Sequence, residues 1–177
     1  MRSSHKFAEN KYERYCQEAR SISLSALPQH LQRAVKLQGI GNSALAAAAH
    51  WEDDPARLVS WDWIFANRYT FRYPKAFDLS VWAGNTLCSL SLGRPSYNGK
   101  FMRLDYIEKA PSNCPFSSDI VGVTILSYET YATLTGASQF RIIDPINDKV
   151  LRSYLKHGGF SYQKGKQGNP HYLVRDL

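Results

Sequence analysis

The segment 140–160 holds the residues whose types and spacing could do chemistry. The apolar run 140–143 predicts a short strand, which ends at Pro145 because proline cannot donate a hydrogen bond to a sheet. Asn147 is a good N-cap for a helix that follows, since its side-chain oxygen can accept a bond from a free amide. Tyr154 then lies on the apolar face of that helix, two turns in. Its phenol can donate a proton, although an ordinary core tyrosine is the alternative interpretation.

This order of strand, asparagine, helix and tyrosine resembles the second half of GNAT-type acyl-CoA N-acyltransferases. In that family an asparagine follows the fifth strand, a tyrosine stands seven residues later, and a Gly-Phe pair closes the helix. Asn147 and Tyr154 fit this spacing, and Gly159-Phe160 fits with one extra residue, Gly158. The resemblance implies transfer of an acetyl or similar acyl group from acyl-CoA to an amine by direct attack. It places Asn147 near the pantetheine arm and makes Tyr154 the general acid toward the departing CoA thiolate.

The preceding part of the chain predicts a sheet. Residues 77–82 and 87–92 alternate apolar and polar side chains, and the turn pair Gly84-Asn85 between them predicts a β-hairpin. Residues 101–108 alternate again and predict a third strand. A three-strand meander of this kind precedes the cofactor helix in GNAT folds, so the resemblance covers residues 77–162.

The predicted fold class is therefore α/β (α+β), with a GNAT-like mixed, mostly antiparallel central sheet flanked by helices. The length of 177 residues suits a single domain, 1–177, with a sizeable core. Residues 1–75 are expected to be mainly helical, with amphipathic helices over 5–20 and 25–36 and a third over 44–49. Residues 77–177 are expected to form the sheet and the cofactor site.

The loop that should bind the pyrophosphate of CoA departs from the family pattern. GNAT enzymes place R/Q-x-x-G-x-G/A before the next helix, here expected over 118–135 and ended by Gly136. The corresponding positions hold Phe116, Asp119 and Val121. Ser117 and Ser118 could supply N–H or hydroxyl donors instead, and Ser118 could cap the helix. Asp119 brings negative charge to the place expected for the diphosphate.

The remaining expected contacts lie on the third strand of the meander. By resemblance to the family, the backbone of Tyr106, Ile107 and Lys109 should hydrogen-bond the pantetheine, in a strand that splays from its neighbour. Glu108 or Asp105 is the candidate base for the acceptor amine, and each could instead be an ordinary surface carboxylate. Acetyl-CoA or another acyl-CoA is the implied co-substrate, and no metal is expected.

Charge leaves a second class of function open. The net charge of +7 would suit the phosphates of coenzyme A, or nucleic acid or tRNA as a partner. The segment 58–73 also concentrates aromatic side chains that could stack on bases or pack in a core, namely Trp61, Trp63, Phe65, Tyr69, Phe71 and Tyr73. The alternative function is thus a GNAT-fold protein without CoA activity that acts as a nucleic-acid- or protein-binding module.

Composition also bounds the compartment. Three cysteines, far apart and in no CxxC pair, favour a reducing compartment and argue against a structural zinc site. The acidic cluster after His50 is typical of a solvated helix end rather than of a metal site. No apolar run approaches the roughly 20 residues of a membrane helix, and the first residues lack the apolar region of a signal peptide. A cytoplasmic protein of bacterial type is expected.

Overall fold

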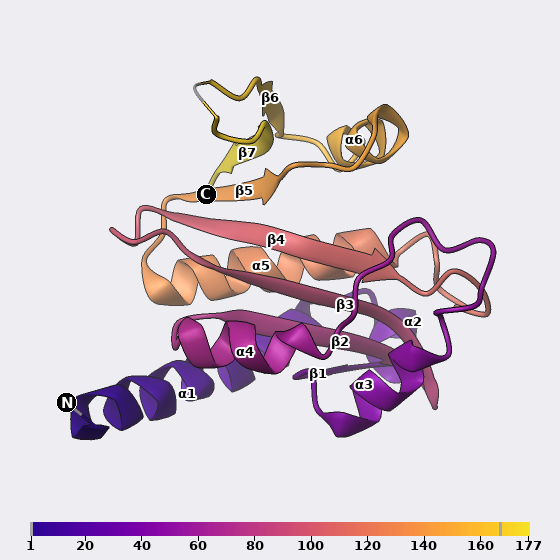
Figure 1. Cartoon of the computed structure of the whole chain (residues 1–177), viewed down its shortest axis with the longest axis horizontal. Coiled ribbons are helices and arrows are strands. Elements are labelled where there is room, and N and C mark those ends of the chain that lie inside the picture. Colours follow the sequence, from indigo (N-terminus) through magenta and orange to yellow (C-terminus); the bar gives the residue numbers. More distant parts are fainter. Residues whose placement is uncertain (1, 167) are drawn as a thin grey trace.

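The computed structural model (Figure 1) describes residues 2–166 and 168–177, with the backbone alone for residues 2–9. Within these residues the chain forms six helices and seven strands. In chain order they are α1 (Arg2–Ala26), α2 (Gln29–Ala34), β1 (Val35–Gln38), α3 (Asn42–Ala49), α4 (Phe65–Arg72), β2 (Phe77–Ala83), β3 (Thr86–Pro95), β4 (Phe101–Lys109), α5 (Ile120–Thr135), β5 (Gln139–Ile143), α6 (Asp148–Leu155), β6 (Ser161–Gln163) and β7 (Tyr172–Asp176).

The strands form one sheet in the order β1-β2-β3-β4-β5-β7-β6. Neighbouring strands are antiparallel except β4 and β5, which are parallel. The sheet is therefore mixed and mostly antiparallel, with helices on both faces, which confirms the predicted fold class (Figure 1). The predicted hairpin is confirmed as β2 and β3, whose turn contains Gly84 at a φ of 59°, a conformation that glycine adopts without strain.

Helices cover the two faces of the sheet in separate groups, with α3 and α4 on one face and α1 and α5 on the other (Figure 1). The central strand β3 is buried at nearly every position, because its side chains meet helices on both sides. Among the described side chains, buried apolar residues form two clusters, one on each face. The buried phenols of the first cluster are satisfied: Tyr128 donates to the carbonyl of Phe77 at 3.0 Å, and Tyr131 to that of Lys75 at 2.9 Å.

The sequence predictions for the N-terminal part need correction. A single helix over 25–36 is wrong: α1 ends at Ala26, Pro28 precedes the short α2, and residues 35–38 form β1. These four residues alternate apolar and polar side chains, and they pair with the free edge of β2, Val35 opposite Ala83. Residues 35–38 follow a helical segment in the sequence, but pairing with β2 at the edge of the sheet makes them a strand.

The start of α5 differs from the prediction, its end agrees with it, and one strand was not predicted. Residues 116–119 form a turn and α5 begins at Ile120, with Asp119 rather than Ser118 at the N-cap position and no side-chain cap bond there. The end of α5 is confirmed, because Gly136 takes the left-handed conformation at a φ of 79°. Strand β7, for which the sequence analysis gave no prediction, lies between β5 and β6 in the sheet.

The pairing of β4 with β5 is short, and this positions the site. Parallel pairing runs from Phe101 opposite Gln139 to Leu104 opposite Ile142. Strand β4 then continues to Lys109, whereas β5 ends at Ile143. The edge of β4 over residues 105–109 therefore has no strand beside it on the β5 side.

Candidate functional site

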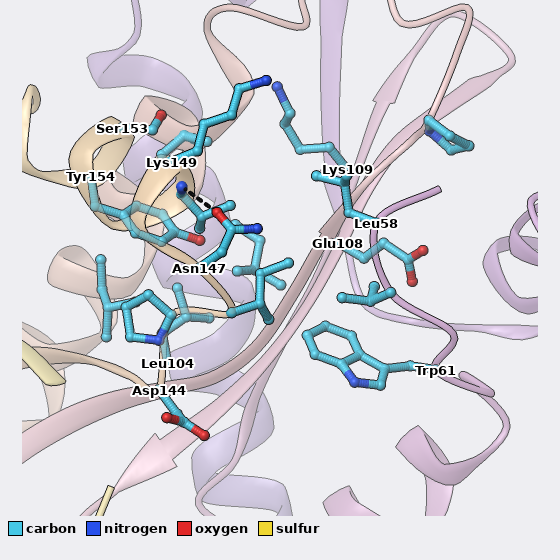
Figure 2. A pocket seen from close by; sticks show the side chains of 18 of the residues that line it. Leu58, Trp61, Leu104, Glu108, Lys109, Asp144, Asn147, Lys149, Ser153 and Tyr154 are labelled. Carbon is cyan, nitrogen blue, oxygen red and sulfur yellow. Dashed lines mark hydrogen bonds between the residues drawn. The ribbon is translucent and has the colours of Figure 1, made fainter. Parts of the chain in front are cut away.

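A cavity of about 390 Å³ lies where β4 and β5 part. Its walls come from the end of β4, from the segment that follows β5, from α6 and from the start of α5. The irregular segment 50–64 between α3 and α4 closes one side through Leu58, Val59 and Trp61 (Figure 2). Side chains from widely separated parts of the chain thus meet at the split in the sheet.

Helix α6 supplies two of the residues that the sequence singled out. The side-chain oxygen of Asn147 accepts a hydrogen bond from the amide of Val150 at 2.9 Å, which confirms the predicted N-cap. The Tyr154 side chain is 4% exposed, and its hydroxyl points toward the cavity in Figure 2. Burial raises the pKa of Tyr154 above its ordinary value, so the phenol is protonated at neutral pH. Burial is the one cause of this shift, with no hydrogen bond or charge from another described residue contributing to it.

The predicted contacts on β4 divide between the two faces of the strand. Ile107 and Lys109 line the cavity. Tyr106 does not, because its ring packs into the second apolar cluster, 5.3 Å from the ring of Trp61 and 4.9 Å from that of Phe65. Its side chain therefore holds the strand in place rather than reaching into the cavity.

Glu108 is buried in an ion pair. Arg57 donates from Nε to Oε1 at 2.6 Å and from Nη2 to Oε2 at 3.2 Å, while the indole of Trp63 donates to Oε2 at 2.6 Å. The Glu108 side chain is only 3% exposed, and its hydrogen bonds raise the pKa of Arg57. Arg57 also donates to the carbonyl of Trp61 at 2.7 Å. Glu108 thereby fastens the segment 50–64 to β4.

Asp105, the other candidate base, is similarly engaged. Tyr69 of α4 donates to its Oδ2 at 2.5 Å, and Arg103 donates from Nε to Oδ1 at 2.6 Å. Burial, and next the charge of Asp105, raise the pKa of Tyr69, so this phenol stays a donor. Both carboxylates that the sequence offered as a base thus already hold two side-chain donors.

The start of α5, where Val121 lines the cavity and Gly122 follows it, carries features that suit an anion. The amides of Asp119 and Ile120 both donate to the carbonyl of Phe116, but none of the described residues accepts from the amides of Val121 or Gly122. These are the free N–H groups of a helix N-terminus, which attract negative charge. Gly122 has no Cβ, and one built there would lie 3.5 Å from the His157 ring.

Two lysine side chains reach toward this end of the cavity, Lys109 from β4 and Lys149 from α6 (Figure 2). The Lys109 ammonium donates to the carbonyl of Ser117 at 2.9 Å and to its hydroxyl at 3.2 Å. Ser118 donates to Oδ2 of Asp119 at 3.0 Å, and neither of these two residues lines the cavity. Lys149, which lies two residues after the predicted cap, was not among the predicted site residues.

The aromatic residues of 58–73 are mostly packed together rather than exposed. Trp63 stacks on Phe65, and Trp61, Phe65 and Tyr69 all contact the Tyr106 ring. Phe71 has an exposed side chain. Most of the rings that could have stacked on bases instead form the core between α4 and the sheet.

Neither a metal-ligand cluster nor a membrane-spanning helix occurs in the part of the chain that the structure describes. The side chains of residues 10–166 and 168–177 include no group of three His, Cys, Asp or Glu that could hold a metal ion. None of the helices over the same residues combines the length and apolar character needed to cross a membrane.

Comparison with known proteins places the fold. No family model matches the chain, and no curated protein matches it in sequence. Solved structures do match: the PaiA N-acetyltransferase of Thermoplasma acidophilum, in complex with coenzyme A, has 14% identity and a TM-score of 0.57 over 81% of this chain and 99% of its own. The Campylobacter jejuni N-acetyltransferase PseH has 12% sequence identity and a TM-score of 0.56, and the match covers 81% of this chain and 98% of PseH.

A third structural neighbour is the acetyltransferase of Salmonella typhimurium that modifies the N-terminal serine of ribosomal protein L7/L12. It shows 11% identity and a TM-score of 0.58, covering 81% of this chain and 95% of its own. At such identities the likeness establishes the fold.

Proposed function

On the premise that this chain has the GNAT fold, we propose that it is an acyl-CoA-dependent N-acyltransferase. One observation carries the proposal: beyond Leu104 and Ile142 the parallel strands part, and the Tyr154 hydroxyl points into the cavity between them. A cavity of this volume is within the range of small-molecule sites. The unpaired edge of β4, the neutral phenol of Tyr154, Lys109 and Lys149 all line this cavity.

Acyl-CoA would bind with its pantetheine arm along the open edge of β4, residues 105–109, as an added strand does. The amides of Val121 and Gly122, with Lys109 and Lys149, would hold the diphosphate. The lysines supply positive charge where the glycine-rich loop of other GNAT proteins is missing. Asp119 is turned toward Ser118 and outside the lining of the cavity, which lessens its repulsion of the diphosphate.

In the reaction, the amine nitrogen attacks the thioester carbonyl and forms a tetrahedral intermediate. Collapse of that intermediate breaks the carbon–sulfur bond, and the electron pair leaves on sulfur. Tyr154 donates its proton to this thiolate, and the nitrogen, which carries one proton too many after the attack, releases that proton to solvent. The Tyr154 phenolate takes up a proton from solvent, so that free CoA, the N-acyl product and the neutral phenol result. The raised pKa of Tyr154 keeps its phenol protonated at neutral pH but also makes it a weaker acid, so the position of the hydroxyl in the cavity carries this assignment.

We assign Glu108 to positioning rather than to proton abstraction. To act as the base, its carboxylate would have to release Arg57 and Trp63, both of which donate to it at 2.6 Å. Its buried ion pair instead sets the position of the segment 50–64, which forms one side of the cavity. We assign Asp105 to positioning as well, because it accepts hydrogen bonds from Tyr69 and Arg103.

The test is calorimetric titration with acetyl-CoA, followed by a thiol-release assay with amine acceptors. Binding at micromolar acetyl-CoA supports the proposal, and Tyr154→Phe should bind equally well but turn over about 100- to 10,000-fold more slowly. Tyr97→Phe is the matched control, since Tyr97 is fully exposed on the β3–β4 turn. A folded protein that binds no acetyl-CoA at millimolar concentration would refute the proposed function.

A further inference from the structure

The cavity separates charge along its length. Lys109 and Lys149 extend to one end of it, and Asp144 and Trp61 lie toward the opposite end in the view of Figure 2. A site built for acyl-CoA alone has no use for a carboxylate at the end far from the phosphates. The second substrate, the acceptor, is the molecule that this end has to recognise.

Three carboxylates of the described residues line the cavity, and Asp144 differs from the other two. Glu108 and Asp105 are each neutralised by an arginine and a second donor within the fold. The Asp144 side chain is 65% exposed, and its partner is His171, whose Nδ1 lies 3.4 Å from Oδ1. Asp144 thus offers a carboxylate that no guanidinium occupies.

The backbone at Asp144 is held in an unusual conformation. Its φ of 52° is in the left-handed region, where aspartate is tolerated better than most residues but still costs free energy. Its amide donates to the carbonyl of His171 at 2.9 Å, and the His171 ring lies 3.4 Å from the carbonyl of Pro145. The segment before β7 therefore fixes the turn that carries the carboxylate.

Several apolar side chains that line the cavity are open to solvent, and of these Leu58 lies beside Lys109 and Glu108 in Figure 2. Leu58 from the segment 50–64 is 73% exposed, and Ile146 from the segment after β5 is 45% exposed. Trp61 is half-buried and also lines the cavity. Large exposed apolar side chains on both sides of a cavity typically mark a surface that a ligand covers.

From this charge separation and apolar rim we propose that the acceptor is a primary amine carried on an aryl or branched alkyl group. Asp144 binds the acceptor as its ammonium ion, which releases one proton to solvent before the neutral amine attacks the thioester, and Trp61 and Ile146 contact the apolar group. The inference rests on the proposed function, and it adds the class of acceptor and the residues that select it. Acceptors with a carboxylate or sulfonate next to the amine are disfavoured, because Asp144 repels them.

The experiment compares three primary amines at saturating acetyl-CoA: phenethylamine, methylamine and taurine, with the released thiol as readout. Phenethylamine should give the highest kcat/KM, exceeding that of taurine at least about tenfold. Asp144→Asn should raise the KM for phenethylamine about tenfold or more and leave the acetyl-CoA dissociation constant unchanged. Asp148→Asn is the matched control, because Asp148 is an exposed aspartate of α6 that does not line the cavity.

Ile146→Ser separates the apolar contact from the charge, because Ile146 lines the cavity two residues after Asp144 and is 45% exposed. It should lower kcat/KM for phenethylamine and leave that for methylamine unchanged. The inference is overturned if acetyl-CoA binds but taurine is preferred, if Asp144→Asn behaves like Asp148→Asn, or if phenethylamine is not acylated at all. Failure of acetyl-CoA to bind is a separate result, which refutes the proposed function and the inference with it.

Discussion

Tyr154 shows how burial alone can prepare a residue for a chemical role. Its ring is packed against the first apolar cluster, and desolvation disfavours the phenolate, so its pKa lies above the ordinary value near 10. A general acid must hold its proton throughout the working pH range. Burial secures that for Tyr154 without any charged neighbour.

The pH dependence of turnover follows from this. Loss of the Tyr154 proton should not lower kcat anywhere below about pH 10. Thiol-release rates measured from pH 6 to 10 on the wild type and on Tyr154→Phe check this. An alkaline decline near pH 8 that is present in the wild type and disappears in Tyr154→Phe would contradict it.

The pair of Arg57 and Glu108 allows positioning and proton abstraction to be told apart. In Glu108→Gln the Arg57 charge loses its partner while still buried, so the free energy of unfolding should fall by about 3 kcal/mol. Turnover should fall as well, because the segment 50–64 loosens. Urea unfolding and the thiol-release assay measure the two effects.

The double variant Arg57→Gln/Glu108→Gln decides between the roles. With no charge left unpaired, it should recover most of the lost stability, and turnover should recover with it if Glu108 only positions the segment. Recovery of stability without any recovery of turnover would show that Glu108 is the base.

At the residue scale, what could be predicted was what is local in sequence. The relation of Asn147 to Tyr154 is fixed by helical periodicity alone, so both residues could be found before the fold was known. Arg57 and Glu108 are 51 residues apart, and Asp144 and His171 are 27 apart, so only the fold brings each pair together. Asp144 could be recognised in the sequence as an aspartate at the end of a strand, but the neighbouring residues did not indicate that it lines a cavity.

Helix α6 is the element that connects the cap to the acid. Asn147 closes its first turn by accepting from the Val150 amide, and Tyr154 follows two turns later on the buried face. Asn147→Ala should lower the free energy of unfolding by about 1 kcal/mol, because an orphan amide of the first turn loses its partner.

Asn147→Asp provides the control for that measurement. Aspartate caps as well as asparagine and suits the positive end of the helix, so its unfolding midpoint in urea should stay at the wild-type value or rise. If Asn147→Ala is as stable as the wild type, the cap contributes nothing and the position of Tyr154 has another cause.

The correctly predicted strands are longer than the strand that was predicted as helix. Strands β2, β3 and β4 are each at least seven residues long, alternate apolar and polar side chains over part of that length and are separated by clear turns, so their pattern sufficed. Strand β1 has four residues directly after a helix, and its state is decided by pairing with β2 rather than by its own pattern. The parting of β4 from β5 likewise depends on register, which no single segment encodes.

At the scale of the whole molecule, the sheet separates two apolar clusters, one on each face, and each cluster supports different residues of the cavity. The cluster that includes α1 and α5 supports Tyr154 and the start of α5. The cluster beneath α3 and α4 holds Tyr106 and Trp63, and through Trp63 it reaches Glu108. The split between β4 and β5 is thus supported from both faces of the sheet.

The same burial makes the stability of the fold sensitive to alkali. Desolvation raises the pKa of several tyrosines, namely Tyr69, Tyr128, Tyr131 and Tyr154. It also raises the pKa of two thiols, Cys16 and Cys88, to about 12. Below the unfolded-state pKa values, near 8.5 for thiols and 10 for phenols, these groups are protonated in both states and stability does not depend on them.

Above those values the unfolded chain releases protons that the folded protein retains, so stability falls as pH rises. Each such group contributes a slope of about 1.4 kcal/mol per pH unit until its folded-state pKa is reached. Urea unfolding at pH values from 8 to 11 should therefore give a free energy of unfolding that declines from about pH 9 and steepens above pH 10. The part of the tyrosinate absorbance that comes from these four buried tyrosines should appear together with unfolding rather than before it. Tyr154→Phe should make the decline shallower, whereas Tyr97→Phe, at an exposed position, should not. A free energy of unfolding that stays constant from pH 9 to 11 would mean that these phenols and thiols ionise as readily in the folded protein as in the unfolded chain.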